Sequence, residues 1–362
     1  MRGTCAADVG AFAAPVNLPP EGQALLDSAA GFFSGRTWWD VVLMHAMPAG
    51  TTAFFIAIRI GGVVAALCPM LRQDGRLNGL TTPYTCEYAP VFAAGLDRAT
   101  RIAAMASFAR HLRNQGTVRL DALPLEWDAL PDLEAGARQA GLHPLRFDHF
   151  GNWYEDVRGL DWAAYLRRRS GALRETIRRR LRRAEKLADA RFDLFTQPAE
   201  MDRAAAAFES VYQRSWKDAE PFPAFNVALM RAMAHRGQLR FGVWSIGAEP
   251  VAVQMWVVQA GHAIVLKLAH DDAYKTHSPG TVLTALMLRH LLDREHVEQI
   301  DFGRGDDGYK QGWAVQRRQR IGVLLVNPWR VSGAIALLRH FAGRVRASLK
   351  RTALKRPGTS GR

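Results

Sequence analysis

The stretch DFGRGDDGYKQGW, Asp301–Trp313, carries four kinds of ionisable group that enzymes use: carboxylate, guanidinium, phenol and amine. Three of its glycines, Gly303, Gly305 and Gly308, permit tight or left-handed turns around the charged residues. A phenol beside a leaving group can act as a general acid, so Tyr309 is the first candidate for proton transfer. The stretch follows an apolar run and predicts a polar loop at the end of a strand.

The other side chains of this loop support two interpretations. Arg304, Lys310 and Trp313 are the candidates for binding a substrate. Alternatively, the neighbouring acids pair with Arg304 and Lys310 only to hold the loop in shape. Both interpretations stay open at the level of sequence.

A second polar loop, HDDAYKTHSPGTVL, lies between an apolar strand and a helix that starts with Ser-Pro-Gly-Thr. A helix N-terminus offers unpaired N–H groups and the positive end of the helix dipole, which suits a phosphate. An ordinary strand-to-helix connection with a good cap, Ser278, is the alternative. The candidate phosphate-binding residues are Lys275, His277, Ser278, Pro279, Gly280 and Thr281.

Three further stretches place aromatic residues beside charged ones. They are GNWYEDV (Gly151–Val157), TTPYTCEY (Thr81–Tyr88) and SWKD (Ser215–Asp218). Such stretches are typical of cleft linings and equally of buried packing. The sequence contains no Walker loop, HExxH motif, dinucleotide glycine fingerprint or nucleophile elbow.

The elements that must position these loops occur as two copies of one unit. The first copy contains TAFFIAIRIGGVVAALCPML, GRLNGLTTPYTCEYAPVFA and RIAAMASFARHLRNQGTVRLDAL. The second contains RFGVWSIGAEPVAVQMWVV, GHAIVLKLAHDDAYKTHSPG and TVLTALMLRHLLDREHVEQIDFG. Each copy predicts a hairpin at a glycine turn, a third strand, a loop with proline, a helix and a further strand. Val64 then corresponds to Val251, and Asp121 to Asp301.

We therefore expect an N-terminal unit over residues 1–150 and a C-terminal unit over residues 151–330. In the first unit, LDALPLEW occupies the place of the polar loop but lacks its Arg and its Tyr-Lys pair. This asymmetry predicts a degenerate first unit and an active site in the second. A basic helix and tail over residues 331–362 are expected to follow, with Ile335, Leu337, Leu338, Phe341, Val345 and Leu349 on the apolar face.

A strongly basic segment lies between the two copies. Residues 167–186 contain ten Lys or Arg and two Glu, and apolar residues recur at helical spacing across Tyr165–Phe192. The pattern predicts one amphipathic helix with a basic outer face. That face is either a solvated surface with ion pairs or a surface that binds an anion. The basic C-terminal helix likewise has two interpretations: it packs on the fold, or it lies on anionic lipid.

The composition limits the class of protein. A net charge of +14 favours an anionic partner, either cofactor phosphates, nucleic acid or an anionic membrane surface, unless it reflects a generally Arg-rich composition. Three cysteines without metal-ligand spacing favour a reducing compartment and no structural metal. The N-terminus has no continuous apolar segment of a signal peptide. The apolar run Ala53–Leu71 is interrupted by Arg59 and Gly61-Gly62, so it predicts two strands rather than a membrane helix.

Two motifs together carry a resemblance to a known family. SPGTVLTALML followed by IDFGRGDDGYKQGWA resembles the GNAT-fold acyltransferases of the CelD/BcsL type, with a BioF-like acetyltransferase domain, relatives of the FemAB peptidyltransferases. GAEPVAVQMWV is similar to their strand after a glycine turn, IRRRLRRAEK to their basic helix, and the half with IGGVVAALCPM to the degenerate copy of tandem members. The resemblance is strongest over residues 153–326. It implies an α/β (α+β) fold of tandem GNAT-like domains, each a mixed, mostly antiparallel twisted sheet flanked by helices.

The resemblance also implies a donor and roles for residues. Acetyl-CoA or another acyl-CoA would bind as co-substrate at splayed strands, with its pyrophosphate at His277–Thr281, although only Gly280 fits the usual Gln/Arg-x-x-Gly-x-Gly/Ala pattern. Tyr309 would protonate the leaving thiolate. Asp301 or Asp306 would orient or deprotonate the acceptor in a direct transfer without a covalent enzyme intermediate.

Three hypotheses follow. The first is a cytoplasmic acyltransferase acting on an amine or hydroxyl of a sugar, an amino acid or a cell-envelope or polysaccharide precursor. The second is a FemAB-like transferase that uses an aminoacyl-tRNA, which the basic helix would serve equally well. The third is a non-catalytic module that binds nucleic acid or the anionic inner face of the membrane through the basic helix and the tail.

Overall fold

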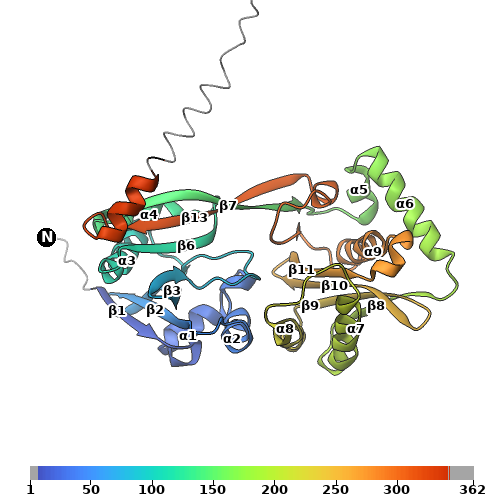
Figure 1. The fold of residues 1–362 in the computed structure, drawn as a ribbon, viewed down its shortest axis with the longest axis horizontal. Coiled ribbons are helices and arrows are strands. Elements are labelled where there is room, and N and C mark those ends of the chain that lie inside the picture. Colours follow the sequence, from blue (N-terminus) through green and yellow to red (C-terminus); the bar gives the residue numbers. More distant parts are fainter. Residues whose placement is uncertain (1–6, 341, 343–362) are drawn as a thin grey trace, which may run out of the picture.

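The computed structural model of the chain describes residues 7–340 and 342. Within these residues thirteen strands form one continuous sheet, in the order β1-β2-β3-β4-β6-β13-β7-β12-β11-β10-β9-β8, with β5 beside β3. Figure 1 shows two lobes side by side. The long strands β7 (His143–Asp156) and β13 (Gln316–Val326), at the top of the view, connect them. The predicted mixed, mostly antiparallel sheet flanked by helices is confirmed.

The N-terminal half begins its sheet with a hairpin at Gly61-Gly62, whose φ angles of 60° and 87° are readily adopted by glycine. The apolar run is therefore two antiparallel strands, as predicted. The strands of this half are β1 (Ala7–Phe12), β2 (Thr52–Ile60), β3 (Val63–Gln73), β4 (Arg76–Gly79), β5 (Val91–Phe92) and β6 (Thr117–Pro124). Its helices are α1 (Pro20–Asp27), α2 (Arg36–His45), α3 (Arg98–Leu112) and α4 (Leu130–Gln139), with 3-10 turns η1 (Pro15–Asn17) and η2 (Phe32–Ser34).

The C-terminal half repeats the arrangement. Its strands are β8 (Ala190–Phe195), β9 (Leu239–Ile246), β10 (Glu249–Gln259), β11 (His262–His270) and β12 (Gln299–Asp301). Its helices are α5 (Trp162–Arg167), α6 (Gly171–Glu185), α7 (Met201–Gln213), α8 (Pro223–His235), α9 (Pro279–Asp293) and α10 (Lys310–Trp313), with η3 (Pro198–Glu200) and η4 (Asp272–His277). In Figure 1, α9 covers one face of this half's sheet, and α7 and α8 cover the other.

The strand pairing confirms the internal repeat. Among the described residues the sheet has two parallel pairs, β4 with β6 and β11 with β12, and each lies at the same point of its copy. The predicted correspondences hold at the level of elements, since Val64 and Val251 lie on the equivalent strands β3 and β10. Asp121 and Asp301 likewise lie on β6 and β12. A tandem arrangement of one unit therefore explains the order of elements along the chain.

The centre of the sheet connects the halves more closely than a simple tandem array requires. Strand β13 lies between β6 and β7, so residues 320–326 pair with β6 of the N-terminal half. Residue 150 falls within β7, whose last residues pair with β12 of the C-terminal half. The division into units 1–150 and 151–330 stays a prediction.

The basic segment is not the single helix that its periodicity predicted. It breaks into α5 and α6 at Arg168–Ser170, and its last residues enter β8. Arg169 is buried at the break, where it pairs with Glu155 and donates to the carbonyl of Trp313 at 2.8 Å. Ser170 then caps α6 by accepting a hydrogen bond from the amide of Leu173. An inward-facing ion pair and a new cap thus interrupt the helix.

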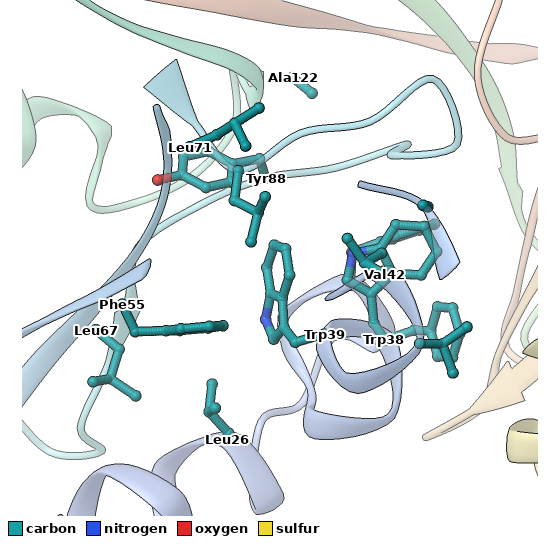
Figure 2. Packing of buried hydrophobic residues seen from close by; sticks show 14 of the residues in the cluster. Leu26, Trp38, Trp39, Val42, Phe55, Leu67, Leu71, Tyr88 and Ala122 are labelled. Carbon is teal, nitrogen blue, oxygen red and sulfur yellow. The ribbon is translucent and has the colours of Figure 1, made fainter. Parts of the chain in front are cut away.

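The core of the N-terminal half extends into the C-terminal half through aromatic side chains. Trp39 on α2 points toward Phe55 on β2, with ring centroids 6.0 Å apart, and toward Tyr88, as Figure 2 shows. Its neighbour Trp38 meets Phe225 on α8 edge to face at 5.8 Å. These aromatic contacts bury large apolar surfaces and hold α2 against α8.

The C-terminal segment is described in part. Residues 331–340 are helical, while Phe341, Val345, Leu349 and the predicted tail lie outside the described residues. Within the described part of the chain, no helix combines the length and apolar content needed to cross a bilayer.

Candidate active site

Strands β11 and β12 separate after a short parallel pairing. They pair only over His262–Ile264 and Gln299–Asp301. Strand β11 then continues to His270, whereas the segment after β12 turns away from it. Gly303 makes this turn with φ of 65°, and a Cβ there would lie 2.6 Å from the carbonyl oxygen of Val265. Glycine is therefore required where the loop passes against β11. The separation opens a crevice between the two strands.

One end of the crevice is a cavity of about 360 Å³ at the N-terminus of α9, which we call the α9 cavity. Five of the six predicted phosphate-binding residues line it, while His277 does not. The complete lining is Trp216, Leu268, His270, Lys275, Ser278, Pro279, Gly280, Thr281, Thr284, Tyr309 and Trp313. The predicted phosphate loop is thus brought together with Tyr309 and Trp313.

The first turn of α9 is shaped for close approach to its backbone. Ser278 occupies the N-cap position of α9, as expected, but it adopts a left-handed conformation with φ of 53° and its side chain makes no capping hydrogen bond. Pro279 occupies the first turn as predicted. Because the first N–H groups of a helix have no intrahelical partner, an uncapped first turn leaves them available to an anion.

A buried hydrogen-bond network connects the first turn of α9 to strand β10. Thr284 donates to the carbonyl of Gly280 at 2.7 Å and accepts from Gln254 at 2.6 Å. Gln254 accepts in turn from the indole N–H of Trp256 at 2.9 Å. Every member is paired, so the network holds the start of α9 rigidly against β10.

Tyr309 stands across the crevice from α9, in the loop before α10. The side chain is 49% exposed and lines both parts of the crevice. Partial desolvation of the phenol, and next the nearby carboxylate of Asp307, raise the pKa of Tyr309 to about 12. The phenol therefore holds its proton at neutral pH and is able to donate it.

The loop that carries Tyr309 is held by Lys310. This ammonium is buried and donates to the carbonyl of Arg304 at 2.6 Å and to the carboxylate of Asp307 at 2.9 Å. Lys310 thus closes the turn between Arg304 and α10. Its contacts favour the interpretation in which part of this stretch shapes the loop.

The other end of the crevice is a second cavity of about 370 Å³, which we call the Tyr84 cavity. It shares Trp216, Leu268 and Tyr309 with the α9 cavity, so the two adjoin. The complete lining is Pro83, Tyr84, Cys86, Trp216, Lys217, Val265, Leu266, Lys267, Leu268, Phe302, Arg304, Asp307, Tyr309 and Lys310. The N-terminal half therefore contributes one wall through residues 83–86.

Tyr84 joins the two halves at this wall. Its hydroxyl donates to Glu220 at 2.6 Å, and its ring stacks on Phe225 with centroids 4.3 Å apart. Lys267 lies over the same ring at 4.6 Å and pairs with Glu220 at 2.5 Å. Sequence missed this cluster, although TTPYTCEY and SWKD had marked two of its borders as cleft-like.

The two aspartates expected to act on the acceptor lie outside both cavities. Asp301 is buried, accepts from Asn152 and from the amide of Gly303, each at 2.7 Å, and pairs with Arg318. Asp306 is exposed and accepts from the indole of Trp153 at 2.7 Å. An ion pair with Arg317, the foremost cause, lowers the pKa of Asp306. Both carboxylates hold the loop, and their catalytic role stays a prediction.

His270 and Asp307 also line the crevice, although neither was among the predicted site residues. His270 lines the α9 cavity with its ring 4.3 Å from that of Trp216, and burial lowers its pKa, so its imidazole is neutral at pH 7. Asp307 lines the Tyr84 cavity. Among the described residues no group of three or more His, Cys, Asp or Glu side chains is arranged to hold a metal ion.

Comparison with known proteins gives a family match for part of the chain and a similar fold for most of it. Residues 171–311 match the family model described as acetyltransferase (GNAT) domain, which includes α9, β12 and the loop with Tyr309. No curated protein matches the chain by sequence. The fold is similar to the crystal structure of FemX, with a TM-score of 0.56 and 11% identity over 86% of this chain and 97% of that one.

Two further solved structures share the fold. The C-terminal domain of a protein assigned as lysylphosphatidylglycerol synthetase from Agrobacterium fabrum gives a TM-score of 0.55 at 13% identity, over 88% of this chain and 94% of that one. L-PGS from Bacillus licheniformis gives 0.50 at 12% identity, over 84% and 95%. At these identities the likeness shows the GNAT-like fold over both halves.

Proposed function

We propose that the protein is an acyltransferase that moves an acyl group, acetyl foremost, from acyl-CoA to an amine or hydroxyl acceptor. One observation carries this proposal: the uncapped N-terminus of α9 and the protonated phenol of Tyr309 face the same crevice between separated parallel strands. The first group suits the pyrophosphate of a donor, and the second suits a leaving thiolate.

The residues of the crevice support a direct transfer. The amides of Gly280 and Thr281 would bind donor phosphate, and the acceptor would enter from the Tyr84 cavity and attack the thioester carbonyl. As the carbon–sulfur bond breaks, Tyr309 would donate its proton to the sulfur and be reprotonated from solvent. The acceptor would release its own proton to a base or to water. Asp301 and Asp306 would act as positioning residues by fixing the loop.

A Gly280→Asp variant tests the donor site. Aspartate at this second position of α9 interacts favourably with the helix dipole but places negative charge where phosphate would bind. We expect CoA and acetyl-CoA to lose at least tenfold in affinity by calorimetry, while unfolding midpoints stay close to wild type.

Ala172→Asp is the matched control, because Ala172 holds the same second position of α6 and lies outside both cavities. It should bind CoA as wild type does. Failure of the wild-type protein to bind CoA or acetyl-CoA at millimolar concentration would refute the acyl-CoA proposal.

A second candidate is transfer from an aminoacyl-tRNA, as in the FemAB proteins. It is favoured by the position of α6, which packs beside α9 and whose Arg180 donates to the carbonyl of Thr276 at 3.4 Å. The outer face of this helix exposes Arg178, Arg179, Arg182 and Arg183. If tRNA phosphates bind there, the binding constant for aminoacyl-tRNA should fall less steeply with salt after three of these residues are replaced by Gln. The magnitude of the slope of log K against log salt should decrease by roughly 2 to 3.

We further propose that the acceptor is a sugar, an amino acid or a cell-envelope or polysaccharide precursor, as the resemblance to the CelD/BcsL type implies. A cytoplasmic location fits the free thiols of Cys68 and Cys86. Peripheral contact with an anionic membrane is the remaining alternative. Liposome binding that persists in Gly280→Asp and Tyr309→Phe variants, without any CoA binding, would favour a non-catalytic module.

A further inference from the structure

The Tyr84 cavity has an excess of positive charge. Four cationic side chains line it, Lys217, Lys267, Arg304 and Lys310, together with one acid, Asp307. Two of the cations are neutralised within the protein. Lys267 pairs with Glu220 at 2.5 Å, and Lys310 pairs with Asp307 at 2.9 Å.

The other two cations have no carboxylate within 4 Å among the described residues. Lys217 is half-buried, and its ammonium lies 5.7 Å from the ring centre of Trp216. Burial, and next the charge of Lys267, lower the pKa of Lys217. An ammonium that is partly desolvated beside a like charge is stabilised by any anion that reaches it.

Arg304 is held in place without being neutralised. Its guanidinium lies 4.5 Å above the ring of Phe150 and donates to the carbonyl of Thr85 at 3.3 Å. Thr85 belongs to the N-terminal half, and Phe150 lies on β7, the strand that connects the two halves. A fixed guanidinium with free N–H groups suits a carboxylate or a phosphate, which it can bind with two hydrogen bonds.

The N-terminal half also keeps Glu220 from neutralising Lys217. Glu220 accepts from the hydroxyl of Tyr84 and pairs with Lys267, which itself lies over the ring of Tyr84. This carboxylate, whose charge acts on Lys217, is thereby committed to another partner. The arrangement leaves two uncompensated positive charges facing one cavity that also contains Tyr309.

We propose that the Tyr84 cavity binds an acceptor that carries an acidic group, a carboxylate or a phosphate, held by Lys217 and Arg304. This inference rests on the proposed acyltransferase function, because it assigns the acceptor class of the same crevice. The cavity of about 370 Å³ is the size of an amino acid or a sugar phosphate. The acidic group fixes the acceptor so that its amine or hydroxyl faces the end of the crevice shared with the α9 cavity.

The test measures binding with the α9 cavity saturated by CoA. Calorimetry with inorganic phosphate, and with glucosamine 6-phosphate against glucosamine, compares charged and neutral probes. We expect phosphate to bind, and the phosphorylated sugar to bind at least tenfold more tightly than the neutral one. Lys217→Met and Arg304→Gln should each reduce phosphate affinity about tenfold, and Lys217→Arg should retain it.

Arg231→Gln is the control for loss of one positive charge, because Arg231 lies on α8, pairs with Asp202 and lines neither cavity. It should leave phosphate affinity unchanged. The proposal is overturned if phosphate does not bind the wild-type protein, or if the Lys217 and Arg304 variants bind it as wild type does. A Lys217→Met variant that loses turnover but not phosphate binding would make Lys217 a base instead. Unchanged CoA binding in these variants separates failure of this inference from failure of the donor site.

Discussion

Lys310 and Lys275 provide a matched pair for measuring what holds the loop with Tyr309. Each lysine pairs with an aspartate three residues before it, Lys310 with Asp307 at 2.9 Å and Lys275 with Asp272 at 3.0 Å. The side chain of Lys310 is 5% exposed, whereas that of Lys275 is 61% exposed. Burial is therefore the main difference between two otherwise similar ion pairs.

The expected cost of Lys310→Met follows from its contacts. Methionine keeps the length of the apolar stem but removes the charged hydrogen bond to the carbonyl of Arg304, about 1.5–3 kcal/mol. Loss of the pair with the exposed carboxylate of Asp307 adds about 0–1 kcal/mol. We expect Lys310→Met to lower the free energy of unfolding by about 2–3 kcal/mol. Lys275→Met, with only an exposed pair to lose, should stay within about 0.5 kcal/mol of wild type.

Urea unfolding followed by tryptophan fluorescence measures both variants, with the midpoint and slope fitted for each. Limited proteolysis at the 303–309 loop gives a local readout, and cleavage should accelerate only in Lys310→Met. Equal stability of the two variants would show that the buried ammonium does not hold the loop. Lys310 would then return to the role of a substrate-binding residue.

Three further predictions concern the crevice and the wall beside it. Tyr309→Phe should lower kcat by about 10²–10⁴, with little change in acetyl-CoA affinity, when thiol release is followed with a chromogenic reagent; unchanged turnover removes Tyr309 from the mechanism. Gly303→Ala should lower the unfolding midpoint and weaken CoA binding, because a Cβ would approach the carbonyl of Val265 to 2.6 Å; wild-type behaviour would contradict the close contact. Burial opposes ionisation of Glu220, but hydrogen bonds from Lys267, Tyr212 and Tyr84 outweigh it and lower its pKa below 4.5. The ionised Glu220 should therefore stabilise the fold fully above about pH 4.5, and this stabilisation should fade as pH falls through the lowered pKa. Wild type and Glu220→Gln should then have the same free energy of unfolding in acid. A difference that persists there would refute this account.

The local part of the fold was predictable because its causes are local. Glycine turns at Gly61-Gly62 and Gly247 define hairpins, and Pro279 marks the start of α9. The repeat was predictable because both copies keep the order of their elements. The same reasoning predicted a phosphate-binding role for the loop before α9. Five of its six candidate residues line one cavity, and the role itself stays a prediction.

The rest depends on partners far apart in the sequence. The hydroxyl of Tyr84 reaches Glu220, 136 residues away, and Asn152 reaches Asp301, 149 residues away. No local pattern distinguishes an aspartate that faces a crevice from one held by Arg318 on a later strand. The break between α5 and α6 was missed for the same reason, because Arg169 finds Glu155 only in the folded structure.

The place of β13 has a consequence for how the chain is made. It is the last described strand, yet it fills the position between β6 and β7, which were synthesised much earlier. At about 5–20 residues per second, translation of residues 157–315 takes roughly 10–30 s, during which β6 lacks this neighbour. An unpaired edge in a nascent chain attracts other strands and promotes aggregation. The sheet that joins the two halves is therefore completed only once β13 has been synthesised, and a chain truncated before residue 316 should accumulate in the insoluble fraction.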